Sequence, residues 1–155
     1  MIDIKQFGHH WGKVQHQLDR VWTWDEVLLL MQTQTASNPQ YLRDLGNSGF
    51  TVGGLASNDY CKAVLDYVHP LAPDYYARAG LYVSLDSNSN SFPPHSDQGQ
   101  HVWIWQILGN TPWFVAGSEF VLEQGELLYI TPGTEHAARP NQPRASISFS
   151  LEKFD

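Results

Sequence analysis

Short apolar runs separated by turn residues fill the second half of this chain and limit the folds it can adopt. Each run has the length of an ordinary β-strand and is rich in β-branched and aromatic residues. Glycine, proline and asparagine stand between the runs, where turns favour them. Such a series predicts a β-sandwich or a β-barrel. The runs are LYVSL from Leu81, HVWIWQIL from His101, PWFVA from Pro112, EFVLE from Glu119, ELLYIT from Glu126 and RASISFSLE from Arg144.

The first half of the chain has a helical pattern instead. In TWDEVLLLMQTQ, Thr23 is placed as the N-cap and Glu26 follows three residues later, which is the spacing of a capping box. A second helix is predicted from Asn58 to about Val68. It must end before Pro70, because the residue that precedes a proline is pushed out of helical geometry.

Length and composition indicate one compact domain. The 155 residues suffice for a core, and 42% hydrophobic with 13% aromatic residues is too apolar for a disordered chain. No repeat or flexible linker divides the sequence. We predict a single domain over residues 1–155, in which a helical N-terminal region, 1–79, packs on a barrel core, 80–155. The expected fold class is mainly β with N-terminal helices.

Charge and cysteine content exclude several classes of partner. The net charge is −7 and the nine Lys and Arg residues are scattered, whereas nucleic-acid binding normally needs clustered cations. No apolar run approaches the roughly 20 residues that span a membrane. The N-terminus has no secretory signal pattern, and the single cysteine, Cys61, has no partner for an internal disulfide. We expect a cytoplasmic protein that binds neither nucleic acid nor membranes.

Three metal-ligand residues follow one another in an order typical of iron enzymes. His95 and Asp97 lie in PPHSD, and His136 ends the segment GELLYITPGTEH. Two histidines and one carboxylate form the facial triad that binds iron(II) and leaves positions open for a cosubstrate and dioxygen. Pro132 and Gly133 tighten the chain just before His136. The sequence therefore predicts an iron(II) site made by these three ligands.

The last apolar run has two chemically different faces, since side chains alternate along a strand. Its polar face would simply be solvated on a surface strand. In a barrel that holds a polar ligand, the same face would point inward. The pattern alone leaves both possibilities open. Arg144, Ser146, Ser148 and Ser150 share the polar face, and Ala145, Ile147, Phe149 and Leu151 share the apolar face.

The segments AGLYVSLDSNSNSFPPHSD, HVWIWQILGNTPWFV and LEQGELLYITPGTEHAA resemble the core of JmjC-type, cupin-fold 2-oxoglutarate oxygenases, especially the ribosomal-protein hydroxylases. With TWDEVLLLM, which resembles the helix before their barrel, the likeness extends over about residues 21–151. It implies a double-stranded β-helix, the jelly-roll barrel of cupins. It also implies iron(II) bound by His95, Asp97 and His136, with 2-oxoglutarate and O2 as cosubstrates. Such enzymes couple decarboxylation of 2-oxoglutarate to hydroxylation of a substrate carbon.

The distal carboxylate of 2-oxoglutarate requires a cationic anchor, because a guanidinium binds a carboxylate through charge-assisted hydrogen bonds. In the hydroxylases that this chain resembles, the cation usually follows the His-x-Asp strand. The matching stretch here, residues 109–112, has none. Arg144 and Ser146 form an R-x-S arrangement similar to that of other 2-oxoglutarate oxygenases, and we predict the anchor there. Tyr82 and Thr111 are expected to add hydroxyl groups.

His101 has two possible roles. With His95 and Asp97 it imitates the spacing of the first motif of plain cupins, which would make it a fourth metal ligand. A fourth protein ligand would close a position that dioxygen needs. We therefore expect His101 to contact the cosubstrate or to lie next to the ligands. Trp103, Trp105 and Trp113 are expected to be core aromatics.

The predicted activity is that of an Fe(II)- and 2-oxoglutarate-dependent dioxygenase that hydroxylates an unidentified protein side chain, amino acid or small metabolite. Residues 86–94 and 38–54 are expected to form the rim of the site. One alternative is a metal-binding cupin that acts as a dioxygenase or isomerase without 2-oxoglutarate. Another is a non-catalytic ligand-binding cupin. The expected partner is a small-molecule or peptide substrate, and the protein would be a monomer or a homodimer.

Overall fold

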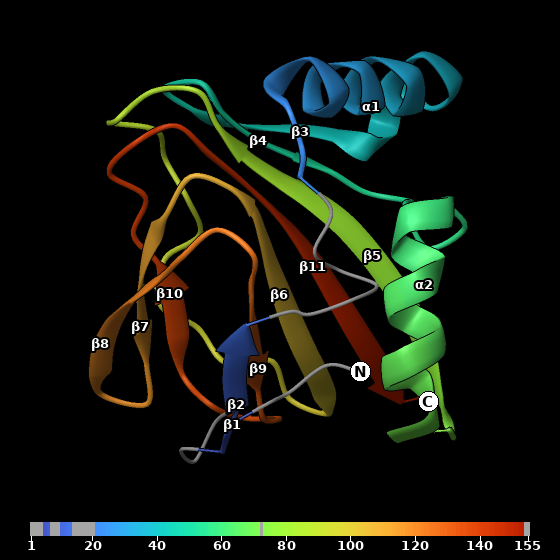
Figure 1. Cartoon of the computed structure of the whole chain (residues 1–155), viewed down its shortest axis with the longest axis vertical. Coiled ribbons are helices and arrows are strands. Elements are labelled where there is room, and N and C mark those ends of the chain that lie inside the picture. The colour runs from blue at the N-terminus through green and yellow to red at the C-terminus, as the bar shows by residue number, and fades with distance from the viewer. Residues whose placement is uncertain (1–4, 7–9, 14–20, 72, 154–155) are drawn as a thin grey trace.

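Two antiparallel β-sheets form the body of the molecule in the computed structural model, which describes residues 5–6, 10–13, 21–71 and 73–153 (Figure 1). All six predicted runs lie in strands, and the predicted fold class, mainly β with N-terminal helices, is confirmed. In sheet order, the large sheet has β1 (Lys5–Gln6), β2 (His10–Lys13), β9 (Glu126–Ile130), β6 (Gln100–Leu108), β11 (Arg144–Lys153), β5 (Tyr75–Ser84), β4 (Gly49–Val52) and β3 (Leu42–Gly46). The small sheet has β10 (His136–Ala138), β7 (Thr111–Val115) and β8 (Ser118–Leu122).

Both predicted helices are present. Helix α1 (Trp24–Ser37) begins with the predicted capping box, in which the N–H of Glu26 donates to the Thr23 hydroxyl and the N–H of Thr23 donates to the Glu26 carboxylate. Helix α2 (Asp59–Val68) is capped by Asn58, whose side-chain oxygen accepts from the N–H of Tyr60. No helix in the described part of the chain is long and apolar enough to cross a membrane. Two short 3₁₀ helices complete the set, η2 (Pro39–Tyr41) and η3 (His69–Leu71).

The N-terminal region over 1–79, which was expected to be helical, contains strands as well as helices. The β3–β4 hairpin joins the large sheet because β4 pairs with β5. The predicted boundary between residues 79 and 80 falls inside β5. Both hairpin strands are short, and β3 is largely exposed. Their pairing with β5 links positions distant in the sequence, so a local pattern does not reveal it.

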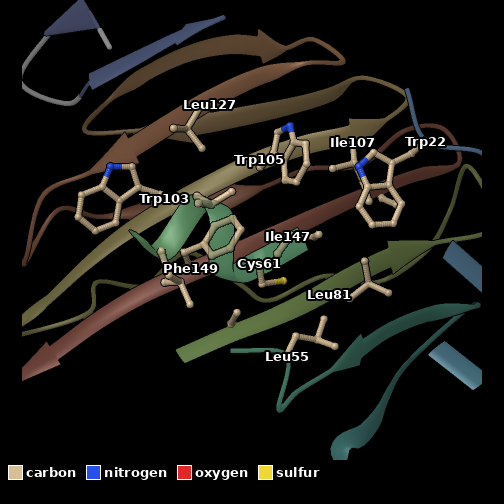
Figure 2. Close-up of a cluster of buried hydrophobic side chains, with 14 of the residues drawn as sticks. Trp22, Leu55, Cys61, Leu81, Trp103, Trp105, Ile107, Leu127, Ile147 and Phe149 are labelled. Atoms are coloured by element: carbon tan, nitrogen blue, oxygen red, sulfur yellow. The ribbon is translucent and has the colours of Figure 1, made fainter. Parts of the chain in front are cut away.

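The outer face of the large sheet, the one that the helices cover, holds the larger apolar core (Figure 2). Side chains of β6 and β11 pack there against α2. The alternation predicted for the last run is observed, because its apolar face belongs to this core. Trp103 and Trp105 lie in the same core, as expected. The outer-face side chains from β6, β9 and β11 include Trp103, Trp105, Leu127, Ile147 and Phe149, and α2 contributes Cys61, Val64, Leu65 and Val68.

The inner face of the large sheet, the one that faces the small sheet, has a second and smaller apolar core. Alternate residues of β6 and β9 on the large sheet meet residues of β7 and β8 on the small sheet. This core fills part of the space between the sheets, and polar side chains occupy the rest. The inner-core residues are Val102, Ile104, Trp113, Val115, Leu122, Leu128 and Ile130.

Candidate metal centre

His95, Asp97 and His136 come together beside the inner face of the large sheet. Asp97 Oδ2 lies 3.2 Å from His136 Nε2 and 3.7 Å from His95 Nε2. The ligand atoms of the three side chains all lie within 4.8 Å of one another. Within the described residues, no other group of three His, Cys, Asp or Glu side chains is arranged in this way. The structure therefore brings together all three ligands that the sequence predicts.

Backbone hydrogen bonds hold the three ligand segments against one another. His95 and His136 form an antiparallel bridge, in which the N–H of each donates to the carbonyl of the other over 3.1 and 2.8 Å. The N–H of Gly133 donates to the carbonyl of Asp97 over 3.1 Å. Gly133 has a φ of 75°, a left-handed conformation that glycine adopts at little cost. The turn before His136 thus ties the two motifs together.

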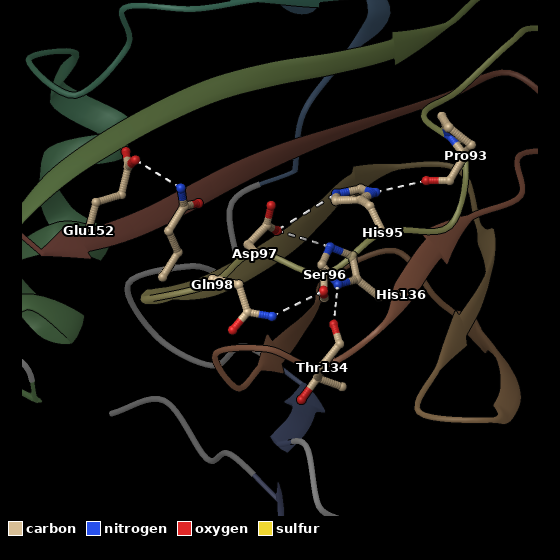
Figure 3. A network of polar contacts seen from close by, with 9 residues as sticks. Pro93, His95, Ser96, Asp97, Gln98, Thr134, His136 and Glu152 are labelled. Carbon is tan, nitrogen blue, oxygen red and sulfur yellow. Dashed lines mark hydrogen bonds and ion pairs between the residues drawn. The ribbon is translucent and has the colours of Figure 1, made fainter.

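Each histidine is oriented by the carbonyl oxygen of the residue two positions earlier (Figure 3). His95 Nδ1 lies 2.8 Å from the oxygen of Pro93, and His136 Nδ1 lies 2.8 Å from that of Thr134. A carbonyl oxygen only accepts, so both Nδ1 atoms carry a proton, and both Nε2 atoms face Asp97, where a metal would take the place of any proton on them. Two imidazole nitrogens and a carboxylate oxygen that face one another fit a divalent transition metal such as iron(II).

The ligands also have the charge and access that a cation site requires. The hydrogen bond with His136 lowers the pKa of Asp97 below its ordinary value, and the nearby His136 and His95 charges act in the same direction, against the effect of burial. An ionised carboxylate is the form that binds a cation. The side chain of His136 is 6% exposed and that of His95 is 40% exposed. The site is therefore open on the His95 side.

A cavity of about 440 Å³ opens beside the ligands. Its volume is within the range of small-molecule sites. Trp113, predicted as a core aromatic, packs in the inner core and also lines this cavity. The predicted rim at 86–94 is partly observed, because Ser91, Phe92 and Pro93 belong to the wall. The remaining lining residues are Tyr82, His95, Asp97, Gln100, Val102, Ile104, His136, Ala138, Ser148 and Ser150.

Arg144 is buried on the inner face and is 2% exposed. It is the first residue of β11, whereas the serines that line the cavity lie further along the strand. Its Nε donates to the Ser84 hydroxyl over 3.0 Å, and its Nη1 donates to the Ser146 hydroxyl over 3.3 Å. Ser146 in turn donates to Gln106. No carboxylate among the described residues lies within 4 Å of the guanidinium. Burial lowers the pKa of Arg144 to about 10.

Tyr82 links the metal ligands electrostatically to Arg144. Burial and the Asp97 charge raise the pKa of Tyr82, while the Arg144 charge and a hydrogen bond with Ser148 lower it. The Tyr82 phenol therefore lies within the electrostatic reach of both groups. Its ring also contacts Phe92 on the cavity wall, with the ring centres 5.9 Å apart. Tyr82 thus lines the same cavity as His95, Asp97 and His136.

Two buried polar atoms of β7 have no hydrogen-bond partner, namely Thr111 Oγ1 and Trp113 Nε1. Both side chains are on the strand face that turns toward the inner core, because Thr111, Trp113 and Val115 alternate with half-buried residues. Buried polar groups are normally satisfied, so such atoms call for an explanation such as a bound ligand. Thr111 was among the predicted cosubstrate residues.

His101 is not near the ligands, which corrects its predicted role. Its side chain stacks with both Trp103 and Tyr129, and its Nδ1 lies 2.5 Å from the Tyr129 hydroxyl. It alternates with Val102, which lines the cavity, and its Cα pairs with Leu151 of the outer core. Burial in this aromatic cluster lowers its pKa. The physical reason is strand alternation: His101 stands two positions before Trp103, so both side chains point to the outer face.

A second and larger depression, about 750 Å³, adjoins the cavity because Tyr82, Gln100, Ser148 and Ser150 line both. Sequence reasoning did not identify the polar cluster that stands in it. Gln100 donates to Glu152 over 2.9 Å, and the Nε of Arg78 lies 3.0 Å from the same carboxylate. The cluster spans β6, β11 and β5, so three distant segments of the sequence contribute to it, and no local motif marks it.

Comparison with known proteins supports the fold. No protein-family model and no curated protein sequence matches this chain. The ribosomal oxygenase YcfD from Escherichia coli, in complex with cobalt and 2-oxoglutarate, has a TM-score of 0.61 and 21% identity over 72% of this chain and 34% of that one. KdgF from Halomonas sp. has a TM-score of 0.54 and 14% identity over 76% of this chain and 92% of that one. An RmlC-like cupin from Shewanella frigidimarina has a TM-score of 0.52 and 12% identity over 76% of this chain and 89% of that one.

At these identities the similarity establishes the fold alone. The two sheets match those of cupin structures, so the predicted jelly-roll barrel is confirmed. The chain spans about a third of the length of YcfD, and most of the length of KdgF and of the RmlC-like protein. The chain is a cupin-fold protein with a His-Asp-His group arranged to bind a metal ion.

Proposed function

We propose that this chain is an Fe(II)- and 2-oxoglutarate-dependent oxygenase that hydroxylates a small molecule or a side chain of a protein. The observation that carries the proposal is the coexistence, in one barrel, of an open-faced His-Asp-His group and a buried arginine with no carboxylate partner among the described residues. The first fits iron(II), and the second fits the distal carboxylate of a 2-oxo acid.

His95, Asp97 and His136 would hold the metal. Iron(II) bound there supplies the redox chemistry that couples decarboxylation of 2-oxoglutarate to hydroxylation of a C–H bond. The chain provides three ligand atoms on one side of the site, with the Nδ1 protons of both histidines fixed by backbone carbonyls. The apolar side chains of Val102, Ile104 and Trp113 keep water from one side of the adjoining cavity.

Arg144 would anchor the cosubstrate. A buried cation without an anion carries a desolvation cost of several kcal/mol, and hydroxyl groups alone do not neutralise its charge. Ser84 and Ser146 take up two of the guanidinium N–H groups and fix its plane. The remaining N–H groups are available to a carboxylate. The unpartnered hydroxyl of Thr111 and the phenol of Tyr82 would complete the polar end of the site.

The substrate would enter along the larger depression that adjoins the cavity. The small residues Gly80, Ser148 and Ser150 leave open space along this depression. The polar cluster of Gln100, Glu152 and Arg78 also lines it. An open groove of about 750 Å³ accepts either a small metabolite or the side chain and backbone of a peptide.

The test is an anaerobic titration with iron(II) followed by 2-oxoglutarate. The weak visible charge-transfer band of a 2-oxo acid chelated to iron reports binding of the cosubstrate at the metal. We expect the band in the wild type, and a requirement for about a hundredfold more 2-oxoglutarate in Arg144→Ala. This factor corresponds to the loss of one buried charge-assisted contact.

Arg139→Ala is the matched control. Arg139 is exposed and pairs with Glu119 on the outside of the small sheet, so its loss removes one positive charge without reaching the barrel interior. The control should bind 2-oxoglutarate like the wild type. If the wild type binds no iron, the proposal fails entirely. If the band appears equally in Arg144→Ala, the oxygenase assignment stands and the anchor lies elsewhere.

A metal-dependent cupin that uses no 2-oxo acid is the second candidate. Two observations favour it: Arg144 is absent from the residues that line the ligand cavity, and residues 109–112 contain no cation. Binding of iron without a charge-transfer band at any 2-oxoglutarate concentration would make this candidate the leading one. The cavity of about 440 Å³ would then hold the substrate itself next to the metal.

A further inference from the structure

The tip of the β3–β4 hairpin is hydrogen-bonded to the loop that precedes the metal ligands. Gly46, Asn47 and Ser48 have φ values of 96°, 52° and 59°, so three consecutive residues adopt a left-handed conformation. This curl turns the backbone carbonyls of the hairpin toward residues 85–90. We call the contact between this tip and Asn90 the clasp.

Asn90 uses both its backbone and its side chain in the clasp. Its N–H donates to the carbonyl of Gly46 over 3.2 Å, and its Nδ2 donates to the carbonyl of Leu45 over 2.9 Å. Its Oδ1 accepts from Asn47 Nδ2 over 3.4 Å. Beside it, the Ser89 hydroxyl donates to the carbonyl of Ser48 over 3.2 Å. An asparagine is suited to this position, because it offers a donor and an acceptor on one short side chain.

The fit between the hairpin tip and Asn90 leaves no room for a side chain. A Cβ atom at Gly49 would lie 2.3 Å from the backbone oxygen of Asn90, and one at Gly46 would lie 2.6 Å from its Nδ2. Gly49 does not have a left-handed φ, so an alanine there would suit its own backbone and would still collide with Asn90. The glycine at position 49 is thus required by the clasp.

A short and stiff segment connects the clasp to the metal site. Ser91, Phe92 and Pro93 follow Asn90 and line the ligand cavity. Two consecutive prolines fix the backbone φ just before His95, so a displacement at Asn90 is carried along the segment. The Pro93 carbonyl is the group that orients the His95 imidazole over 2.8 Å. His95 is the most exposed of the three ligands and so depends most on this support.

We propose that Asn90 is a positioning residue for the metal site. By fixing the start of the 91–95 segment on the β3–β4 hairpin, it sets where Phe92 closes the cavity and keeps the Pro93 carbonyl aligned with His95 Nδ1. The part of this inference that concerns metal affinity rests on the proposed metal site. The part that concerns the His95 imidazole holds for the metal-free protein as well.

The first measurement is the affinity for cobalt(II), followed by visible absorption, in wild type, Asn90→Ala and Gly49→Ala. The two variants damage the clasp from opposite sides, one by removing hydrogen bonds and the other by inserting a methyl group. We expect each to raise the dissociation constant about 10- to 100-fold, the range found when the group that orients a metal-binding histidine is lost.

The second measurement is the tautomer of His95 in metal-free protein at pH 8, read from the ¹⁵N chemical shifts of its imidazole. In the wild type the proton should reside on Nδ1. In both clasp variants a substantial fraction should move to Nε2, because the carbonyl that fixes the proton is displaced. A residue that merely stabilises the fold would lower the melting temperature without moving this signal.

Gly53→Ala and Asn88→Ala are the controls. Gly53 lies at the end of β4 without a left-handed φ, and a Cβ atom there would meet its nearest neighbour at 3.7 Å, an ordinary contact. Asn88 is an exposed asparagine in the same loop. Both should match the wild type. Wild-type affinity and tautomer in the folded clasp variants would overturn the proposal. If the wild type itself binds no metal, the proposed function fails, and the tautomer comparison still decides the role of Asn90.

Discussion

The two faces of the large sheet differ in chemistry although the same strands build both. On the outer face, Ile147 and Phe149 of β11 are fully buried against α2 and the neighbouring strands. On the inner face, the same strand presents Arg144, Ser146 and Ser148 to the barrel interior. The outer face is a continuous apolar core, whereas the inner face combines a small apolar cluster with buried polar groups.

The difference indicates a division of work between stability and ligand binding. Burial of apolar surface contributes roughly 25 cal/mol per Å², so the outer face, which holds the larger apolar core, makes the larger hydrophobic contribution to stability. A buried arginine without a carboxylate partner opposes folding. The barrel therefore keeps Arg144 at a cost, and the outer face offsets that cost. Each of the following predictions tests whether the two faces are separate in this sense.

The largest effect is expected for Phe149→Ala on the outer face. Removing a fully buried phenylalanine side chain leaves a cavity and costs about 3–5 kcal/mol of unfolding free energy. Guanidinium chloride unfolding measures the loss. The dissociation constant for cobalt(II), measured on the folded protein, should stay within about twofold of the wild type, because additive behaviour is expected for distant sites. A large loss of metal affinity would show that the two faces are coupled.

The reactivity of the Cys61 thiol tests whether water and reagents reach the core on the outer face. Burial raises the pKa of this thiol to about 12, so the reactive thiolate is about a thousandfold rarer at pH 8 than for an ordinary cysteine. Labelling by a disulfide reagent should be slow in the native protein and fast in denaturant. Because the folded pKa is raised, the native rate should keep increasing above pH 9 rather than level off there. A native rate equal to that of the unfolded chain would contradict the burial of Cys61.

Arg144→Met tests the separation of the two faces from the inner side. Methionine matches the aliphatic part of the arginine side chain and carries no charge, so it removes the desolvation cost of the guanidinium. We expect the unfolding free energy to rise by about 1–3 kcal/mol, although Ser84 loses the donor to its hydroxyl. Binding of 2-oxoglutarate should be lost in the same variant. Arg139→Met on the surface should change stability by about 0.5 kcal/mol or less. A loss of stability in Arg144→Met would mean that Arg144 is retained for the fold.

Much of the fold was predictable from local patterns. The six apolar runs, the Thr23 capping box and the second helix are all visible in the sequence because each depends on neighbouring residues. The grouping of His95, Asp97 and His136 was predictable because their order and spacing are specific. The side of the sheet on which the His101 side chain lies was not predictable. Both faces of β6 are apolar, with Val102 and Ile104 inside and two tryptophans outside, so alternation could not decide which one lines the cavity.

The β3–β4 hairpin and the clasp were missed for another reason. Their function depends on contacts between residues about 40 positions apart in the sequence, as between Asn47 and Asn90. Segment 38–54 was expected at the rim of the site; Tyr41 and residues 51–54 line the larger depression that adjoins the cavity, whereas none of the segment lines the ligand cavity itself. A retrospective signal is the tip sequence Gly-Asn-Ser-Gly, which begins with two residue types that tolerate left-handed backbone, glycine and asparagine.

The smallest effect is expected for Ser148→Ala, the inner-face neighbour of Phe149 on the same strand. The hydroxyl is half-buried and lines the cavity, so its removal should change the unfolding free energy by about 0.5 kcal/mol or less. Its hydrogen bond lowers the pKa of Tyr82, so the variant should titrate Tyr82 at a higher pH, as followed by ultraviolet absorption. Ser150→Ala, whose hydroxyl contacts Glu152 instead, should leave that titration unchanged. Phe149 would then determine stability, whereas its neighbour Ser148 would affect only the electrostatics of the site, so the two faces of the strand would have separate roles.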